Sequence, residues 1–337
     1  MKWRCTVWFV FLSAMLVHQA KSQGFATEVS QFVGDNARPF LQPIADGLHS
    51  SIHAGIFSPM PESEGLHVSL RVVGMGVPIP DEKKTFKPKP YNKPVEFQRG
   101  GITYIGDLEI APNELPTAAG LGKKYTFTGR LKRIRPKGLP YIPNPIYDAI
   151  QQDATVTVGG FADVSSVLLG TTQLTIGSLL RTEIDFRFLP TIRVDDIGEV
   201  KMFGVGLRHD VGSYFSLPMA TSLHVMYQSL TVQANEKEFT ASLDQSSVSV
   251  QLHFSKTFPV GILQFVPNIA CGYESTNLDV GYNFADPYIG KQNLTFNGGG
   301  SLRFAGGLHT KLWKIIFSAD YNLALMNGFS VGLGLEI

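Results

Sequence analysis

Apolar and polar residues alternate through the second half of the chain, and the pattern continues to its last residue. From Phe329 to Ile337 every second residue is apolar, and the residues between them are small or polar. Successive side chains of a strand point to opposite faces, so this pattern predicts a strand with one apolar face. The same alternation recurs in five earlier segments: Glu183–Phe188, Phe203–Asp210, Val248–Ser255, Thr276–Phe284 and Ile315–Leu323.

These segments favour a transmembrane β-barrel over a soluble β-sandwich, although alternation by itself fits both. Membrane-crossing strands need about ten residues, as predicted here, whereas strands of soluble sheets are most often about five or six residues long. Aromatic residues also stand near strand ends, as in interfacial girdles: Tyr227, Tyr273, Tyr282, Trp313 and Tyr321. The predicted fold class is all-β, an antiparallel transmembrane β-barrel of about 10 strands, within a range of roughly 8 to 14.

The first 22 residues have the three parts of an export signal. Two basic residues precede an apolar run from Val7 to Val17, and Ala20-Lys21-Ser22 is a small-x-small cleavage site. The apolar run is too short to span a bilayer, which takes about 20 residues. We therefore expect residues 1–22 to be a cleaved signal peptide, and the exported chain to be either soluble or a barrel.

Residues 23–62 carry apolar residues at three- and four-residue spacing, which predicts an N-terminal helical plug or periplasmic segment. Pro39 and Pro43 interrupt the stripe, so we expect two short helices. His49 and His53 have the i, i+4 spacing of a metal pair, but no third ligand is near in sequence, and a solvated face is the favoured interpretation. The residues expected to pack against the barrel are Phe32, Phe40, Leu41, Ile44 and Leu48.

Residues 63–153 hold a first strand, Leu66 to Val77, followed by a long segment rich in proline and lysine. Prolines at this density argue against regular strands over much of the segment, although Gly101–Ile110 and Lys124–Lys132 are candidates for short ones. The basic residues here either bind anionic lipid A phosphates or polysaccharide, or form a solvated loop surface. The main body of the barrel is expected over residues 154–337.

Composition limits the function further. Removing residues 1–22 takes three of the 29 basic residues and leaves 26 against 28 acidic ones, so nothing suggests a nucleic-acid partner. Only Cys271 follows the signal, which leaves no intrachain disulfide. We find no pattern for a cofactor or a metal site, and we do not expect an enzyme.

Two groups of polar residues are candidates for chemistry. One is a set of charges expected to face the lumen, as a network that braces the wall or as a selectivity device: Glu183, Asp185, Arg187, Arg208 and Asp210. The other is His253 and Ser255 on one face of a strand, with Glu274 as an orienting acid, which is the remote hypothesis of a lipid deacylase.

Short motifs carry a resemblance to a known family. They are Pro43-Ile44-Ala45-Asp46-Gly47-Leu48, Val77-Pro78 with Lys84-Thr85-Phe86, Leu139-Pro140-Tyr141-Ile142-Pro143, Arg187-Phe188-Leu189-Pro190 and Gly204-Val205-Gly206-Leu207-Arg208-His209-Asp210. With these the chain resembles an uncharacterised family of outer-membrane proteins from Bacteroidota and their relatives, which implies a β-barrel with no assigned activity. In its plan of a plug before a barrel it is also similar to long-chain fatty-acid channels, without matching their motifs. Unlike most outer-membrane barrels, the chain ends in Ile337 and not in an aromatic residue.

The functional expectation is an outer-membrane β-barrel of a Gram-negative bacterium that passes a small or amphipathic solute, of unknown identity, past an N-terminal plug. The alternative is a closed structural or envelope-interaction barrel without transport. A lumen of about ten strands is only modestly wider than one that side chains nearly fill, which argues against an open pore. The expected partners are outer-membrane lipid and the barrel-assembly machinery.

Overall fold

The computed structural model describes residues 36–59, 66–89, 91–99, 101–110, 113–141, 153–159, 164–194, 198–215, 217–235, 239–284 and 291–337. The chain forms two compact units. The barrel unit comprises Ile44–Ile79 and Ser165–Ile337. The insert unit comprises Pro80–Val164 and the start of the N-terminal helix, up to Pro43.

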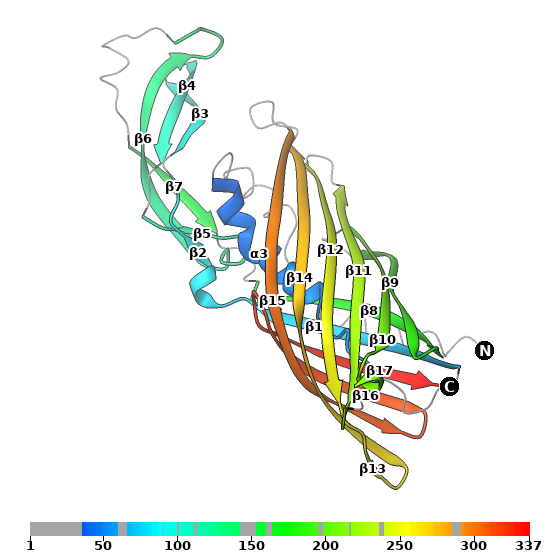
Figure 1. The fold of residues 1–337 in the computed structure, drawn as a ribbon. Helices are drawn as coiled ribbons and strands as arrows, with labels where there is room; N and C mark the ends of the chain where they lie inside the picture. The colour runs from blue at the N-terminus through cyan, green and yellow to red at the C-terminus, as the bar shows by residue number, and fades with distance from the viewer. Residues whose placement is uncertain are drawn as a thin grey trace, which may run out of the picture. The chain divides into compact units, whose positions relative to one another are not determined.

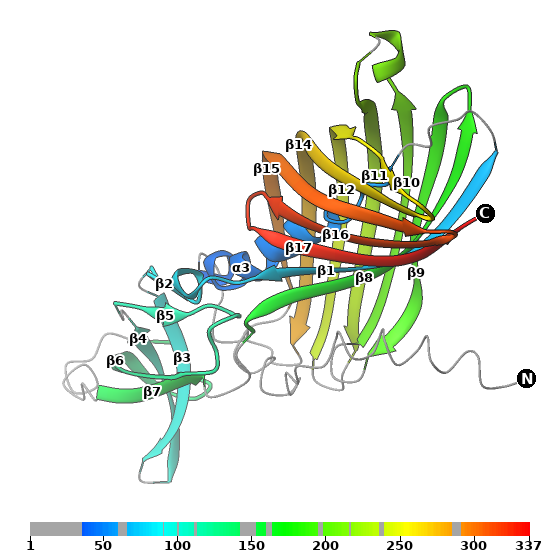
Figure 2. The ribbon, with the colours of Figure 1, turned by 90° about the horizontal axis from the view of Figure 1, so that it is seen from below.

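Ten antiparallel strands close into a barrel, which confirms the predicted fold class (Figures 1 and 2). The ring closes because β1 pairs with the last strand, β17, and β12 pairs with β14; a short strand, β13 (Phe258–Val260), adds to the side of β14. The strands of the ring are β1 (His67–Pro78), β8 (Ser166–Leu179), β9 (Thr182–Val194), β10 (Gly198–Asp210), β11 (Ala220–Asn235), β12 (Phe239–Ser255), β14 (Leu263–Phe284), β15 (Lys291–Leu312), β16 (Ile315–Leu323) and β17 (Gly328–Glu336).

The barrel has two ends that differ in their connections. At the C-terminal end, where β17 finishes and β1 begins, two connections are tight turns, at Leu180–Arg181 and Trp313–Lys314, and two are longer, over residues 211–219 and 256–262. At the insert end, where β1 finishes and β8 begins, the chain leaves for the insert unit. Here β14 and β15, each 22 residues long, exceed the roughly 9–11 residues that a membrane crossing needs.

In the half of the barrel near the C-terminal end, polar side chains face inward and apolar ones outward. Arg208 on β10 and His253 on β12 are buried, while their neighbours Leu207 and Leu252 are 52% and 38% exposed. A soluble sandwich has the opposite arrangement, so this half has the polarity of a membrane barrel. Outward-facing aromatic residues on β9, β10, β11 and β14 mark the limit of this half toward the insert end: Phe188, Phe203, Tyr227 and Tyr273.

Toward the insert end the polarity reverses along the same strands. Leu278 on β14 and Phe296 on β15 are buried inside, and polar side chains lie outside: Lys201, Gln233, Asp244, Asn277, Asp279, Asn293 and Thr295. The expectation that Leu278 belongs to a lipid-facing apolar face of β14 was therefore wrong, because this part of the strand follows the rule for proteins in water. The insert-end half therefore has the polarity of a barrel wall that faces water.

The insert unit contains a four-stranded antiparallel sheet in the order β3 (Tyr91–Arg99), β4 (Ile102–Ile110), β6 (Lys124–Pro136) and β7 (Asp153–Gly159). A second small sheet pairs β2 (Thr85–Phe86) with β5 (Leu115–Pro116), after the 3-10 turn η2 (Asp81–Lys83). Both candidate strands of this region are confirmed. The argument from proline was wrong for β3, which tolerates Pro94 because it is an edge strand of its sheet.

In the part of this segment that the structure describes, a single helix, α3 (Ala37–Ile52), continues through Pro43, where we expected an interruption. Pro39 lies in the first turn, where backbone N–H groups have no helical partner in any case. Pro43 removes only the bond to the carbonyl of residue 39, near the start, so the helix is preserved. No helix in the described part of the chain has the length and apolar character to cross a membrane.

The change of polarity along the strands predicts position-dependent effects of an outward charge. Val205→Arg places a cation in the lipid-facing half and should reduce the free energy of unfolding by about 2–4 kcal/mol, because lipid solvates charge poorly. Asn277→Arg, also outward but in the insert-end half, should change it by less than about 0.5 kcal/mol. Urea unfolding in lipid vesicles, followed by heat-modifiable gel migration, measures both. Equal effects would contradict the assignment of the two halves.

Candidate functional site

A segment of the chain, Ile44–Ser58, runs lengthwise through the barrel; we call it the plug. Gly47 lies against Val167, at the insert end of β8, whereas Ser58 contacts Arg208, near the C-terminal end of β10. The next described residues enter β1 at the C-terminal end. From Ala45 to Ser58 every residue except the half-buried Leu48 is buried. The plug therefore occupies the lumen over most of its length.

Three arginines of the barrel wall bind backbone carbonyls of the plug. Arg303 on β15 donates to the oxygen of Ser50 at 2.8 Å, and Arg187 on β9 donates to those of Ile52 and Ala54 at 3.0 and 3.1 Å. Arg208 donates to the oxygen of Ser58. The last carbonyls of a helix lack helical partners and carry the negative end of its dipole, so cations suit them. The barrel wall thus caps the C-terminus of α3.

Carboxylates on the same wall hold two of these arginines in place. Arg303 Nε donates to Glu274 Oε2 at 2.5 Å, and Arg208 forms an ion pair with Glu183. All four side chains are almost completely buried. A buried charge is tolerated when it is paired and hydrogen-bonded, as each of these is.

Asp185 lies beside the Arg208–Glu183 pair and joins strands β8, β9 and β11. Its carboxylate accepts hydrogen bonds from Gln173 at 3.2 Å and from Thr175, and it lies 3.2 Å from His224 Nε2. Arg187 also donates to Gln228 Oε1 at 2.9 Å. Cross-strand bonds of this kind brace the wall while the arginines reach inward.

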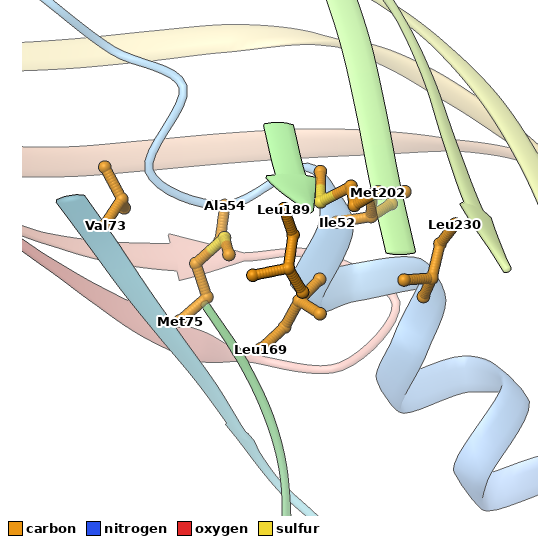
Figure 3. Packing of buried hydrophobic residues seen from close by; sticks show 8 residues of the cluster. All are labelled: Ile52, Ala54, Val73, Met75, Leu169, Leu189, Met202 and Leu230. Atoms are coloured by element: carbon orange, nitrogen blue, oxygen red, sulfur yellow. The ribbon is translucent and has the colours of Figure 1, made fainter. Parts of the chain in front are cut away.

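Nearer the insert end, the contact between plug and wall is apolar (Figure 3). Ile52 and Ala54 pack among inward side chains of five strands, and Leu48 packs against this cluster from the plug. The wall residues are Val73, Met75, Leu169, Leu189, Met202 and Leu230. Burial of a large aliphatic side chain contributes about 1.5–3 kcal/mol, so this cluster stabilises the plug independently of the arginines.

Toward the C-terminal end the plug presents Phe57 to two histidines. The ring of Phe57 lies 5.1 Å from that of His253 and 4.7 Å from that of His309, between centroids. His309 Nε2 is 3.5 Å from Asp320 Oδ1. An aromatic ring thus occupies the lumen between β12 and β15, where an open channel would need solvent.

The interpretation of His49 and His53 as residues of a solvated face was wrong. Both are buried against β14: His49 Nε2 lies 3.0 Å from Glu274 Oε1, and His53 Nε2 lies 3.3 Å from Thr276 Oγ1. Among the described residues, no three His, Cys, Asp or Glu side chains are grouped as metal ligands.

Four of the five predicted lumen charges, Glu183, Asp185, Arg187 and Arg208, are fully buried in the wall network. Asp210 has a different place: it accepts hydrogen bonds from the backbone N–H groups of Gly212 and Ser213, and so caps the turn η3 (Gly212–Tyr214). Sequence reasoning missed Arg303, although Leu302 and Phe304 on either side of it are outward-facing apolar residues and their alternation points it inward.

The five residues predicted to pack against the barrel lie in different parts of the structure. Leu48 packs in the apolar cluster and Ile44 is half-buried, whereas Phe40 and Leu41 belong to the insert unit. There Phe40 is buried, and its carbonyl accepts a hydrogen bond from Ala118 N at 2.8 Å. Phe32 lies outside the described residues.

The deacylase hypothesis fails on geometry, because Glu274 is not beside His253. In the pairing of β12 with β14, Glu274 faces Ser249 and His253 faces Ala270, a separation of about 13 Å along the strand. His253 Nε2 lies 3.1 Å from Gln251 Oε1, and Glu274 is bound to Arg303 and Ser301. Ser255 is buried on the same face of β12, but the predicted acid does not orient its neighbouring histidine.

The chain belongs to a family of unknown function (DUF6588), whose model matches residues 1–337. A search of curated proteins found no significant match. Solved structures with similarity include the translocator domain of the autotransporter NalP from Neisseria meningitidis, with 10% identity over 88% of this chain and 94% of that chain and a TM-score of 0.24. A loop-deletion mutant of OmpT, an outer membrane protein of Vibrio cholerae, has 11% identity over 82% and 99%, with a TM-score of 0.25. A BenF-like porin from Pseudomonas fluorescens Pf-5 has 6% identity over 83% and 100%, with a TM-score of 0.14.

The arginine–carboxylate pairs predict a specific double-mutant result. Arg303→Met leaves Glu274 as a buried charge without its guanidinium and should cost about 3–5 kcal/mol, whereas adding Glu274→Gln should recover part of that loss. Arg193→Met, which removes an exposed pair with Glu199, should cost less than about 1 kcal/mol. Urea unfolding in detergent micelles measures all of these. If Glu274→Gln lowers the free energy of unfolding further in the Arg303→Met background, Arg303 does not stabilise the barrel through its pairing with Glu274.

Proposed function

We propose that this member of the family is a closed outer-membrane barrel that anchors the insert unit and holds it available to another component of a Gram-negative envelope. The observation that carries the proposal is the bonding of three wall arginines to the backbone of the plug. A hydrogen bond to a charged group contributes about 1.5–3 kcal/mol, and a buried partner left without one costs at least as much. A solute would have to break several such bonds to pass.

The polarity of the barrel supports an orientation. The half toward the insert end has a polar exterior, so it projects from the membrane, and the insert is joined to the strand ends there. Bacterial barrels have short periplasmic turns and longer extracellular connections. The insert would then be on the cell surface, and the strand end at Ile337 would face the periplasm, where the barrel-assembly machinery acts on the chain.

The sheet of the insert unit supports a role in interaction more than in binding phosphate. Several of its basic residues are paired across strands: Arg133 with Asp107 at 2.8 Å, Lys137 with Glu96 at 2.9 Å, and Lys132 with Glu109. Neutralised cations of this kind attract an anion such as lipid A phosphate less than free ones do. A surface of alternating charge suits a protein or polysaccharide partner.

Passive transport of a small or amphipathic solute is the second candidate, and the polar lumen favours it. Arg71 Nε and Nη2 and His309 Nδ1 are buried and have no hydrogen-bond partner among the described residues. Buried polar groups of this kind are usually satisfied by water. A hydrated region of the lumen beside Phe57 would form one part of a path for a solute. The rest of that path would open only after the plug moves.

Conductance in planar bilayers separates the two candidates. The wild-type barrel should remain at baseline, whereas Arg187→Met should give transient openings, because it frees two plug carbonyls without leaving a carboxylate of the same ion pair unpaired. Arg193→Met is the control and should stay closed. Steady conductance of the wild type, equal to that of Arg187→Met, would favour transport and would overturn the closed barrel.

Epitope tags test the orientation. Gly138, in the insert, has positive φ and open space around it, so a tag at this turn should be tolerated. An antibody should label the tag at Gly138 on intact cells, to the same extent as after the outer membrane is permeabilised. Labelling only after permeabilisation would place the insert in the periplasm.

A further inference from the structure

The connections at the C-terminal end of the barrel are unusually apolar. Turns of soluble proteins favour Gly, Pro, Asn, Asp and Ser, yet here large apolar side chains stand at the turns and are strongly exposed. We call this set the basal rim: Leu66, Leu180, Tyr214, Phe215, Leu217, Met219, Phe258, Val260, Ile262, Trp313 and Ile337. It includes Leu180 at 88%, Ile262 at 77% and Trp313 at 73% exposure, so these side chains do not pack onto the barrel itself.

The opposite end has a different composition. The sequence of its connections includes Asp195 and Asp196, Glu236-Lys237-Glu238 and Asp286, whose placement lies outside the described residues. One connection at that end also exposes an apolar side chain, Leu325 at 45%, so the two ends differ in how many large apolar residues their connections carry and not in kind. An apolar patch this large on one end indicates a binding surface.

The depth of the lipid-facing half explains why the turns are apolar. On β12 the outward apolar residues extend from Val248 to Phe254, seven residues, and on β15 they extend from Leu302 to Leu312, eleven residues. At about 3.3 Å per residue and a tilt of about 40°, these lengths span about 18 and about 28 Å, compared with the roughly 25 Å apolar band of such barrels. The band therefore reaches the turns at this end, and the basal rim lies in the membrane interface.

Cations are interleaved with these apolar residues. Lys256 Nζ lies 5.9 Å from the ring centroid of Phe258, and Lys314 Nζ lies 5.6 Å from that of Trp313. Arg181 follows Leu180 directly, and all three cations are exposed. Long basic side chains with apolar neighbours place their charge at headgroup level while the stem and the aromatic ring lie in the acyl region.

We propose that the basal rim is a binding surface for anionic phospholipid headgroups, with Lys256 and Lys314 contacting the phosphates and Phe258, Trp313 and Ile262 immersed beside them. A membrane surface that carries anionic lipids attracts basic residues close to it, which gives the rim a preference among lipids. The proposal does not depend on whether the lumen conducts.

The fluorescence of Trp313 shows directly whether the basal rim lies in lipid or in water. The chain has three tryptophans, and substituting Trp3→Phe and Trp8→Phe in the full-length chain leaves Trp313 alone. In phosphatidylglycerol vesicles its emission should be blue-shifted relative to free tryptophan, resist quenching by acrylamide, and be quenched by lipids brominated near the carbonyl region. A water-like emission maximum with full access to acrylamide would show that the rim lies in solvent and would overturn the proposal.

The preference of the basal rim for anionic lipid tests whether Lys256 and Lys314 contact the phosphates. In the same background, quenching of Trp313 by brominated phosphatidylglycerol should exceed quenching by brominated phosphatidylcholine at equal mole fraction, by several-fold in relative affinity. Lys256→Gln with Lys314→Gln should bring that ratio close to one while the blue shift persists. Lys201→Gln, an outward lysine of the insert-end half, is the control and should leave the ratio unchanged. An unchanged ratio in the double variant would show that the two lysines do not bind the anionic headgroups.

Discussion

A polypeptide that passes through a barrel must have its backbone carbonyls hydrogen-bonded, and the rest of this structure depends on how that is done. The plug crosses a lumen whose wall already uses its own backbone groups in the ring of strands, so side chains must supply the donors. Arg187, Arg208 and Arg303 do so, and Glu183 and Glu274 make two of these cations tolerable in the interior. The polar wall, its carboxylates and the position of α3 are parts of one arrangement.

A second feature is that the apolar side of a single strand changes along its length, from the outer face in one half of the barrel to the inner face in the other. On β14, Tyr273 points outward into the lipid-facing half, and a few residues later Leu278 points inward while Asp279 faces solvent. A β-bulge in the pairing of β14 with β15 lies at Glu274–Thr276, between these two parts. The membrane crossing is thus only a section of a longer barrel, and the projecting section has the core of a soluble protein, in which Ile52 and Ala54 are enclosed.

Much of the fold follows from local pattern, and much of the site does not. Alternation predicts the strands because successive side chains of any strand point to opposite faces. The closed ring follows from the membrane-barrel interpretation of those strands. It cannot show that Leu278 faces inward, since the medium outside the strand decides which face is apolar. The helical stripe indicated a plug but not its depth: His49 and His53 look like solvent residues until β14 supplies Glu274 and Thr276. Alternation with Leu302 and Phe304 could have placed Arg303 inward, but contacts that join residues more than 200 positions apart leave no mark in either segment, so its bond to Ser50 and the place of Phe57 were not recognised.

The plug precedes β1, and the ring closes where β1 meets β17, the first strand and the last. At its other side, the start of α3 is held in the insert unit, where the Asn36 side chain exchanges two hydrogen bonds with the backbone of Lys89. The residues that fill the lumen are thus continuous in sequence with β1, the strand at which the ring closes. Contacts between the plug and the wall and the pairing of β1 with β17 therefore depend on the same short stretch of chain, and a displaced plug would pull on the strand that closes the barrel.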